Sequence, residues 1–216
     1  MAIRNYIWDF DGMLFDTYPH TLACFIEIYR RHGQELDPDE AYRLFKVTMW
    51  DAFNFYKTDK QTQREFYELE NDISFKPEGT PYPFIPETLR YIAENGGRNF
   101  LYTHRDLVAL KYLEKYGLDG LFTELVTSET GFPFKPAPDA IEYLVGKYDL
   151  DKSECMMLGD RSIDVGSGAN ANIATCLFDE DNCLKDVPCT VYTNDTKAIL
   201  DFVKTQLPPD TTMSAE

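Results

Sequence analysis

Four short clusters of acidic, hydroxyl and basic residues follow one another along this 216-residue chain. They are Asp9-Phe10-Asp11-Gly12, then Thr103, then Lys135-Pro136, then Gly159-Asp160 with Asp164 four residues later. Each cluster stands at or just beyond a short apolar run of the kind that forms β-strands. The carboxyl ends of parallel strands meet at one edge of an open α/β sheet, which is where ligands bind. The order of these residues therefore predicts one common site.

The residue types in the clusters indicate phosphate chemistry assisted by a metal ion. Four carboxylates at one edge would repel one another unless a cation and a lysine compensated their charge. A divalent cation can orient a carboxylate and neutralise phosphoryl oxygens, and the carboxylate can then attack to give an aspartyl-phosphate that water cleaves. A second carboxyl group can move the protons. The spacing of Asp160 and Asp164 allows both to face one ion with the hard oxygen ligands that magnesium prefers.

Thr103 and Lys135 fit the same chemistry. A hydroxyl and main-chain N–H groups at the start of a helix bind phosphate well. A lysine held by Pro136 and Pro138 can stabilise both phosphoryl oxygens and nearby carboxylates.

Each cluster taken alone also has an ordinary structural explanation. Asp9 to Gly12 could form a turn after a strand, Thr103 and Asp160 could cap helices, and Lys135 could be a solvated loop charge. All four clusters in one order, each at a strand end, favour a shared site over four separate coincidences.

The elements that must position these clusters alternate between strand and helix. Strand-like runs are expected at 3–8, 99–102, 121–126, 155–158 and 173–178. Helical periodicity lies between them, with Pro138 opening one helix and Gly117 ending another. This βαβα alternation predicts an α/β, Rossmann-like core with a mainly parallel sheet and helices on both faces.

A helical insert interrupts this alternation after the first cluster. One helix is expected between Pro19 and Gly33, a second from Asp37 through Phe55, and a third over 62–71. A proline-rich connector follows at 76–86. We therefore expect an α/β core at 1–16 and 85–207, a helical insert at 17–84, and a disordered tail at 208–216.

Charge and cysteine usage narrow the class of protein. Asp and Glu number 37 against 21 Lys and Arg, a net charge of −16, which disfavours nucleic acid and anionic membranes as partners. The five cysteines show no CxxC pair, as expected of reduced thiols. We see no signal peptide and no apolar stretch near the roughly 18 residues that span a membrane. A cytoplasmic protein is expected.

The clusters resemble the motifs of the haloacid dehalogenase superfamily of phosphohydrolases, over most of the chain. Asp9 to Thr17 is similar to the first motif, DxDGxxxD[ST], and Thr103, Lys135 and the Asp160–Asp164 pair match the second, third and fourth. The resemblance implies Asp9 as nucleophile, Asp11 as general acid and base, and Thr103 and Lys135 as catalytic groups that bind the phosphoryl group. It implies Mg²⁺ held by Asp9, by Asp11 through its main-chain carbonyl, and by Asp160 and Asp164. His104 and Arg105 are not fixed by the motif and are candidates for binding a substrate carboxylate or phosphate, or for surface and capping roles.

The insert at 17–84 resembles the cap of phosphoglycolate-phosphatase-like members, which closes over the substrate. Members that cleave carbon–halogen bonds lack an acid two residues after the nucleophile, so Asp11 favours phosphoryl transfer. The resemblance thus implies a magnesium-dependent phosphatase acting on a small phosphate monoester, such as phosphoglycolate or a sugar phosphate. The alternatives are a phosphomutase of the β-phosphoglucomutase type and a non-catalytic ligand-binding member. The sequence leaves the physiological ester and the oligomeric state open.

Overall fold

The computed structural model describes residues 2–209, whose contacts divide the chain into two compact units. One unit comprises the chain up to Leu14 and from Pro81 onward, and the other comprises Phe15–Thr80. The insert expected at 17–84 therefore begins two residues later and ends four residues later than this second unit. The disordered tail expected at 208–216 lies almost entirely outside the described residues.

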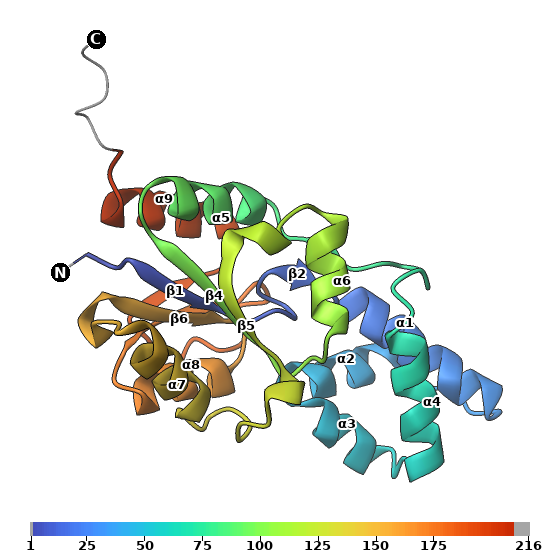
Figure 1. The fold of residues 1–216 in the computed structure, drawn as a ribbon. Helices are drawn as coiled ribbons and strands as arrows, with labels where there is room; N and C mark the ends of the chain where they lie inside the picture. The colour runs from blue at the N-terminus through green and yellow to red at the C-terminus, as the bar shows by residue number, and fades with distance from the viewer. Residues whose placement is uncertain (1, 210–216) are drawn as a thin grey trace. The chain divides into compact units, whose positions relative to one another are not determined.

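The first unit is a parallel sheet covered by helices. Within the described residues, six strands lie in the order β5-β4-β1-β6-β7-β8, and every neighbouring pair is parallel. Figure 1 shows α5 and α9 against one face and α7 and α8 against the other. The strands are β1 (Asn5–Trp8), β4 (Arg98–Tyr102), β5 (Phe122–Val126), β6 (Cys155–Gly159), β7 (Ala174–Phe178) and β8 (Val191–Thr193). The helices are α5 (Ile85–Glu94), α6 (Val108–Lys115), α7 (Asp139–Tyr148), α8 (Ser162–Asn170) and α9 (Thr196–Gln206), with short 3₁₀ turns at Asp119–Leu121, Ser128–Thr130 and Lys152–Glu154. The predicted α/β, Rossmann-like core is confirmed.

The central strand β1 determines where the site lies. Its four residues are all buried, as expected of a parallel strand with helices on both faces. Trp8 pairs in register with Leu101 of β4 and Leu158 of β6. Asp9 therefore leaves the sheet at the same edge as the residues that follow β4 and β6.

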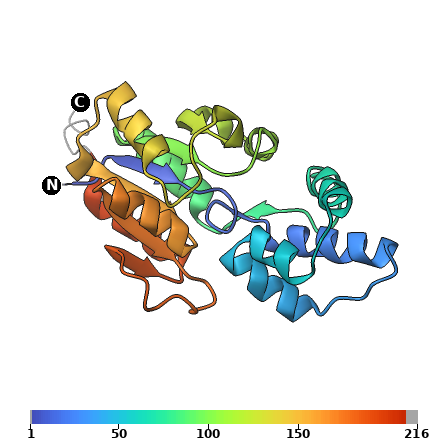
Figure 2. The same ribbon diagram turned by 90° about the horizontal axis from the view of Figure 1, so that it is seen from below.

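The second unit is mainly helical, and a two-stranded sheet of β2 (Phe15–Asp16) and β3 (Thr80–Pro81) stands where the chain enters and leaves it. The ring of Phe25 is central to its core, because it packs against Phe45, Phe53 and Phe66 at centroid distances of 5.1, 6.1 and 5.6 Å. Figure 2 shows the helices of this unit gathered together. They are α1 (Tyr18–Arg31), α2 (Pro38–Val47), α3 (Met49–Phe55) and α4 (Lys60–Glu70).

Two local predictions differ from the structure. The single helix expected from Asp37 through Phe55 is two helices, because Thr48 is extended (φ −155°, ψ 154°) and its side chain caps α3 by accepting from the Asp51 N–H. A threonine hydroxyl competes in this way with helical backbone bonds. Strand β8 was not predicted, because it has only three residues, which is too short for a readable strand pattern.

Candidate active site

The ammonium group of Lys135 joins two carboxylates in the interior of the α/β unit. Lys135 Nζ lies 2.7 Å from Asp9 Oδ1 and 2.8 Å from Asp164 Oδ1. All three side chains are essentially buried, with exposed fractions of 0 to 2%. The structure therefore brings together residues from the first, third and fourth sequence clusters, although Asp9 lies 126 positions and Asp164 lies 29 positions from Lys135 in the chain.

Asp164 reaches this position because the chain folds closely at the start of α8. Its Oδ2 accepts a hydrogen bond from the Arg161 main-chain N–H at 3.0 Å, which satisfies one of the free donors of the helix. A Cβ atom at Gly159 would lie 2.2 Å from the Asp164 Cβ. Only glycine therefore permits Asp164 to lie against the end of β6.

Asp160 completes an acidic cluster with these residues. Carboxylate oxygens of Asp9, Asp160 and Asp164 lie within 4.8 Å of one another, and all three residues are buried. The guanidinium of Arg161 lies 3.7 to 3.9 Å from oxygens of the same three carboxylates. Two basic side chains thus face three acidic ones.

The charges of these groups depend on one another. Burial opposes the charge of Lys135, but the Asp164 and Asp9 carboxylates outweigh it and raise the pKa of Lys135. Burial also opposes the ionised form of Asp164, yet Lys135 and Arg161 lower the pKa of that carboxyl. For Asp9 the balance is reversed: burial, followed by the neighbouring Asp164, raises the pKa to about 7 although Lys135 and Arg161 oppose the rise. A further cation beside Asp9 would favour its ionised form.

The donor set fits a magnesium ion. Asp9 Oδ2 is buried and has no hydrogen-bond partner among residues 2–209, while Oδ1 accepts from Lys135. Carboxylate oxygens are the hard ligands that magnesium prefers. Both oxygens of Asp164 accept N–H groups of the protein, so Asp9 and Asp160 are the carboxylates better suited to direct coordination.

The side chain of Asp11 lies in a different environment. Its carboxylate pairs with Arg105, whose Nη2 lies 2.8 Å from Oδ1. The Asp11 side chain is 28% exposed, whereas that of Arg105 is 7% exposed. The structure therefore gives Arg105 a partner within the protein and leaves Asp11 accessible from solvent.

Thr103 and His104 follow β4 at the same edge of the sheet. Thr103 is buried, and its hydroxyl oxygen accepts the Arg105 main-chain N–H at 3.0 Å, which leaves the hydroxyl proton available to donate. His104 Nε2 accepts the main-chain N–H of Lys135 at 2.8 Å.

Sequence reasoning did not select Arg161 or Tyr102 as site residues. Arg161 stands between two predicted metal ligands, so its position in the Asp160–Asp164 cluster was an available signal. Tyr102 lies with its ring 4.6 Å from Lys135 Nζ, a contact that pairs distant segments and has no local signal in the sequence.

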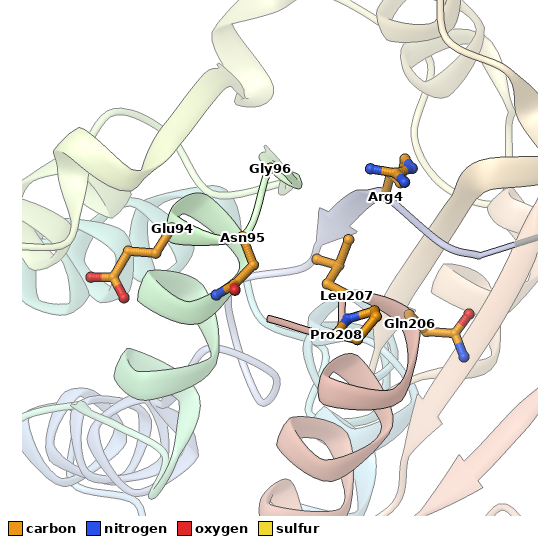
Figure 3. A pocket seen from close by; sticks show the side chains of 7 residues that line it. All are labelled: Arg4, Glu94, Asn95, Gly96, Gln206, Leu207 and Pro208. Atoms are coloured by element: carbon orange, nitrogen blue, oxygen red, sulfur yellow. The ribbon is translucent and has the colours of Figure 1, made fainter. Parts of the chain in front are cut away.

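A separate hollow of about 430 Å³ lies near the amino end of β1 (Figure 3). None of the predicted site residues lines it. The lining residues are Arg4, Glu94, Asn95, Gly96, Gln206, Leu207 and Pro208. In the part of the chain that the structure describes, every helix is too short or too polar to cross a membrane.

Comparison with known proteins identifies the family. The family model described as haloacid dehalogenase-like hydrolase matches residues 6–178, which is well over half of the chain. The protein belongs to the haloacid dehalogenase-like hydrolases. The resemblance inferred from the four motifs is confirmed, and the protein is an enzyme of the hydrolase class.

Similar proteins match both units of the chain. The pyrophosphatase PpaX of Halalkalibacterium halodurans is 24% identical over 210 residues, covering 87% of this chain and 95% of its own. A hydrolase from Streptococcus pneumoniae TIGR4, known from a crystal structure, is 32% identical with a TM-score of 0.62, covering 87% of this chain and 98% of its own. The phosphoglycolate phosphatase of Haemophilus influenzae is 29% identical over 94 residues, covering 43% of this chain and 42% of its own.

Proposed function

We propose that the protein is a magnesium-dependent phosphatase that hydrolyses a small phosphate monoester through an aspartyl-phosphate on Asp9. The contact of Lys135 Nζ with both Asp9 and Asp164 carries this proposal. A buried lysine between two carboxylates supplies positive charge where a phosphoryl group would meet Asp9. The family assignment and the names of the relatives support a phosphate substrate.

In this proposal Asp9 is the nucleophile. Its Oδ1 already accepts from Lys135, and its carboxylate would offer one oxygen to the phosphorus atom and the other to the cation. Attack forms an O–P bond, breaks the ester O–P bond and releases the alcohol; water then hydrolyses the acyl phosphate and regenerates the carboxylate. Lys135 and the Thr103 hydroxyl donate to the phosphoryl oxygens. Asp9, Asp160 and the main-chain carbonyl of Asp11 would hold Mg²⁺, which when bound would supply charge neutralisation for the same oxygens.

Asp11 is the proposed general acid and base. It protonates the leaving alcohol in the first half of the reaction and removes a proton from water in the second. Its exposed fraction of 28% is compatible with access to both the leaving group and water. Asp164, which was expected to bind metal, is better suited to holding Lys135, because both of its oxygens are already hydrogen-bonded.

The insert is the proposed cap that selects the substrate, in keeping with its position directly after the first motif. The relatives are named for different substrates, pyrophosphate and phosphoglycolate, so their names do not select one. The five cysteines are all free thiols, which supports a reducing compartment such as the cytoplasm.

The test is phosphate release from a panel that contains phosphoglycolate, sugar phosphates, nucleotides and pyrophosphate, with magnesium and with a chelator. Asp9→Asn serves as the blank, because it keeps the shape of the side chain but removes the nucleophile. Magnesium-dependent release that is lost in the variant supports the proposal. Release that persists in Asp9→Asn contradicts it. Isomerisation of a sugar phosphate that requires a bisphosphate would instead indicate a mutase.

A further inference from the structure

The two residues that flank Thr103 both contact the loop that carries Lys135. Tyr102 is the last residue of β4, and His104 lies two positions further along the chain. The loop that they contact comprises Pro133, Phe134 and Lys135. The segment that bears the phosphate-binding threonine is thus tied to the segment that bears the lysine.

His104 makes the shorter of these contacts. Its Nε2 accepts the main-chain N–H of Lys135 at 2.8 Å, and its ring packs edge-on against Phe134 at 4.6 Å. Burial, with a further contribution from Lys135, lowers the pKa of His104 to about 3. The ring is therefore neutral at physiological pH, with its other nitrogen carrying the proton, and Nε2 can act as an acceptor.

Tyr102 contacts the side chain of Lys135. Its ring is buried and lies 4.6 Å from Lys135 Nζ, within the range of a cation–π contact. Its hydroxyl donates to the Pro133 carbonyl at 3.4 Å, a long and correspondingly weak bond. Lys135 is thus held at its main chain by His104 and at its ammonium group by Tyr102.

A lysine needs such support because its side chain has four rotatable bonds and loses much conformational freedom when it is fixed. The two carboxylates that receive the ammonium come from the segment after β1 and from α8, so they cannot fix the main chain of the loop. A hydrogen bond to the main-chain N–H does this directly.

We propose that His104 is a positioning residue, which with Tyr102 fixes the loop so that the Lys135 ammonium lies between Asp9 and Asp164. This inference rests on the proposed phosphatase function, in which Lys135 stabilises the phosphoryl group. His104 then acts through Lys135, because the His104 Nε2 accepts the main-chain N–H of that residue.

Two variants separate the hydrogen bond from the packing. His104→Phe keeps an aromatic ring beside Phe134 and removes the acceptor. His104→Gln places an amide oxygen near the position of Nε2 and restores an acceptor. His32→Phe, a histidine of the helical unit with a 40% exposed side chain, is the matched control.

The kinetic readout is the separate change of kcat and KM for the best ester. Because a catalytic group displaced by about 1 Å can cost about a hundredfold, we expect His104→Phe to lower kcat by about tenfold or more. We expect KM to change by less than about threefold and His104→Gln to recover most of kcat. Wild-type kcat in His104→Phe, or a folded His104→Gln variant as slow as His104→Phe, would overturn the inference. Should His104→Phe not fold, the kcat of His104→Gln decides: near wild-type supports the inference, and a tenfold loss overturns it.

A crystal structure of His104→Phe gives a readout that does not depend on activity. We expect the Lys135 ammonium to leave at least one of its two carboxylates. An ammonium that remains 2.7 Å from Asp9 and 2.8 Å from Asp164 would overturn the inference whether or not the enzyme hydrolyses esters. Failure of the wild type to release phosphate from any ester would instead count against the proposed function, and the crystal comparison would still decide the role of His104.

Discussion

The guanidinium of Arg105 contacts both carboxylate oxygens of Asp11. Arg105 Nη2 lies 2.8 Å from Oδ1, and Nε lies 3.0 Å from Oδ1 and 3.1 Å from Oδ2. The guanidinium also lies over the Phe10 ring, 5.9 Å from its centroid. A planar group bound to both oxygens fixes the orientation of a carboxylate more firmly than a lysine would. Arg105 therefore controls where the proposed acid and base points.

Arg105→Met removes this contact while keeping a long, largely apolar side chain. We expect kcat to fall by about tenfold to a hundredfold, because correctly placed general acid–base catalysis contributes about that much or more. KM should change little, since the contact is with Asp11. Arg90→Met, an exposed arginine of α5, is the control for loss of a positive charge. A rise in KM at constant kcat would show instead that Arg105 binds the substrate, the role that sequence analysis considered.

Gly159→Ala tests the close approach that places Asp164. The added Cβ would lie 2.2 Å from the Asp164 Cβ and 2.7 Å from its Oδ2, so α8 or the Asp164 side chain must shift. We expect kcat to fall by about tenfold or more, since Lys135 loses one of its two carboxylates. Gly146→Ala in α7 is the control, because its Cβ would meet nothing within 4 Å. Equal activity of the two variants would show that the shift does not reach Lys135.

Lys135→Met tests how the buried charges affect stability. Removing one partner of a buried ion pair leaves uncompensated charge and costs about 3–5 kcal/mol of unfolding free energy. We expect a loss of this size in urea unfolding with a chelator present, and a smaller loss when magnesium is added, because a bound cation would replace part of the charge. Lys147→Met is the comparison. The Lys147 side chain is 46% exposed and its ammonium pairs with Glu124, so this substitution should lower the free energy of unfolding much less. Equal losses for the two variants would argue against a compensating role for Lys135.

The sequence predicted helices and strands correctly where the local pattern of apolar residues agreed with their packing in the fold. Strands β1 and β6 are short and fully buried, so the sequence shows them as apolar runs. The break at Thr48 was not readable as a helix end, because apolar residues continue at helical spacing on both sides of it. Its signal was the pair Thr48 and Asp51, which cap the next helix. Strand β8 forms only because β7 offers it an edge, and that edge is invisible in the sequence.

The sequence indicated which residues lie at the candidate site better than it indicated which residues they contact. The positions of Asp9 and Asp160 could be predicted because each follows a strand of one parallel sheet, whereas Lys135 lies further along the loop after β5 and was indicated by its residue type beside Pro136 and Pro138. The partners of His104 and Arg105 could not, because they lie 31 and 94 positions away in the chain. The sequence made them candidates for binding a substrate carboxylate or phosphate, or for surface and capping roles, whereas the structure shows a main-chain N–H and a carboxylate as their partners. Their roles toward a substrate stay predictions that the kinetic variants test.

The neutral state of His104 predicts a pH dependence of stability. Burial lowers the pKa of His104 to about 3 from an ordinary value of 6.5. Between these values the unfolded chain binds a proton at this residue and the folded protein does not, so this contribution to stability is lost as the pH falls below about 6.5. Urea unfolding of the metal-free protein should therefore show that wild type loses stability relative to His104→Gln between pH 7 and pH 4. Comparison with the variant cancels the carboxylates that titrate in the same range. A difference that stays constant with pH would mean that His104 has the same pKa in the folded and the unfolded protein, and it would contradict the buried, neutral state of the ring.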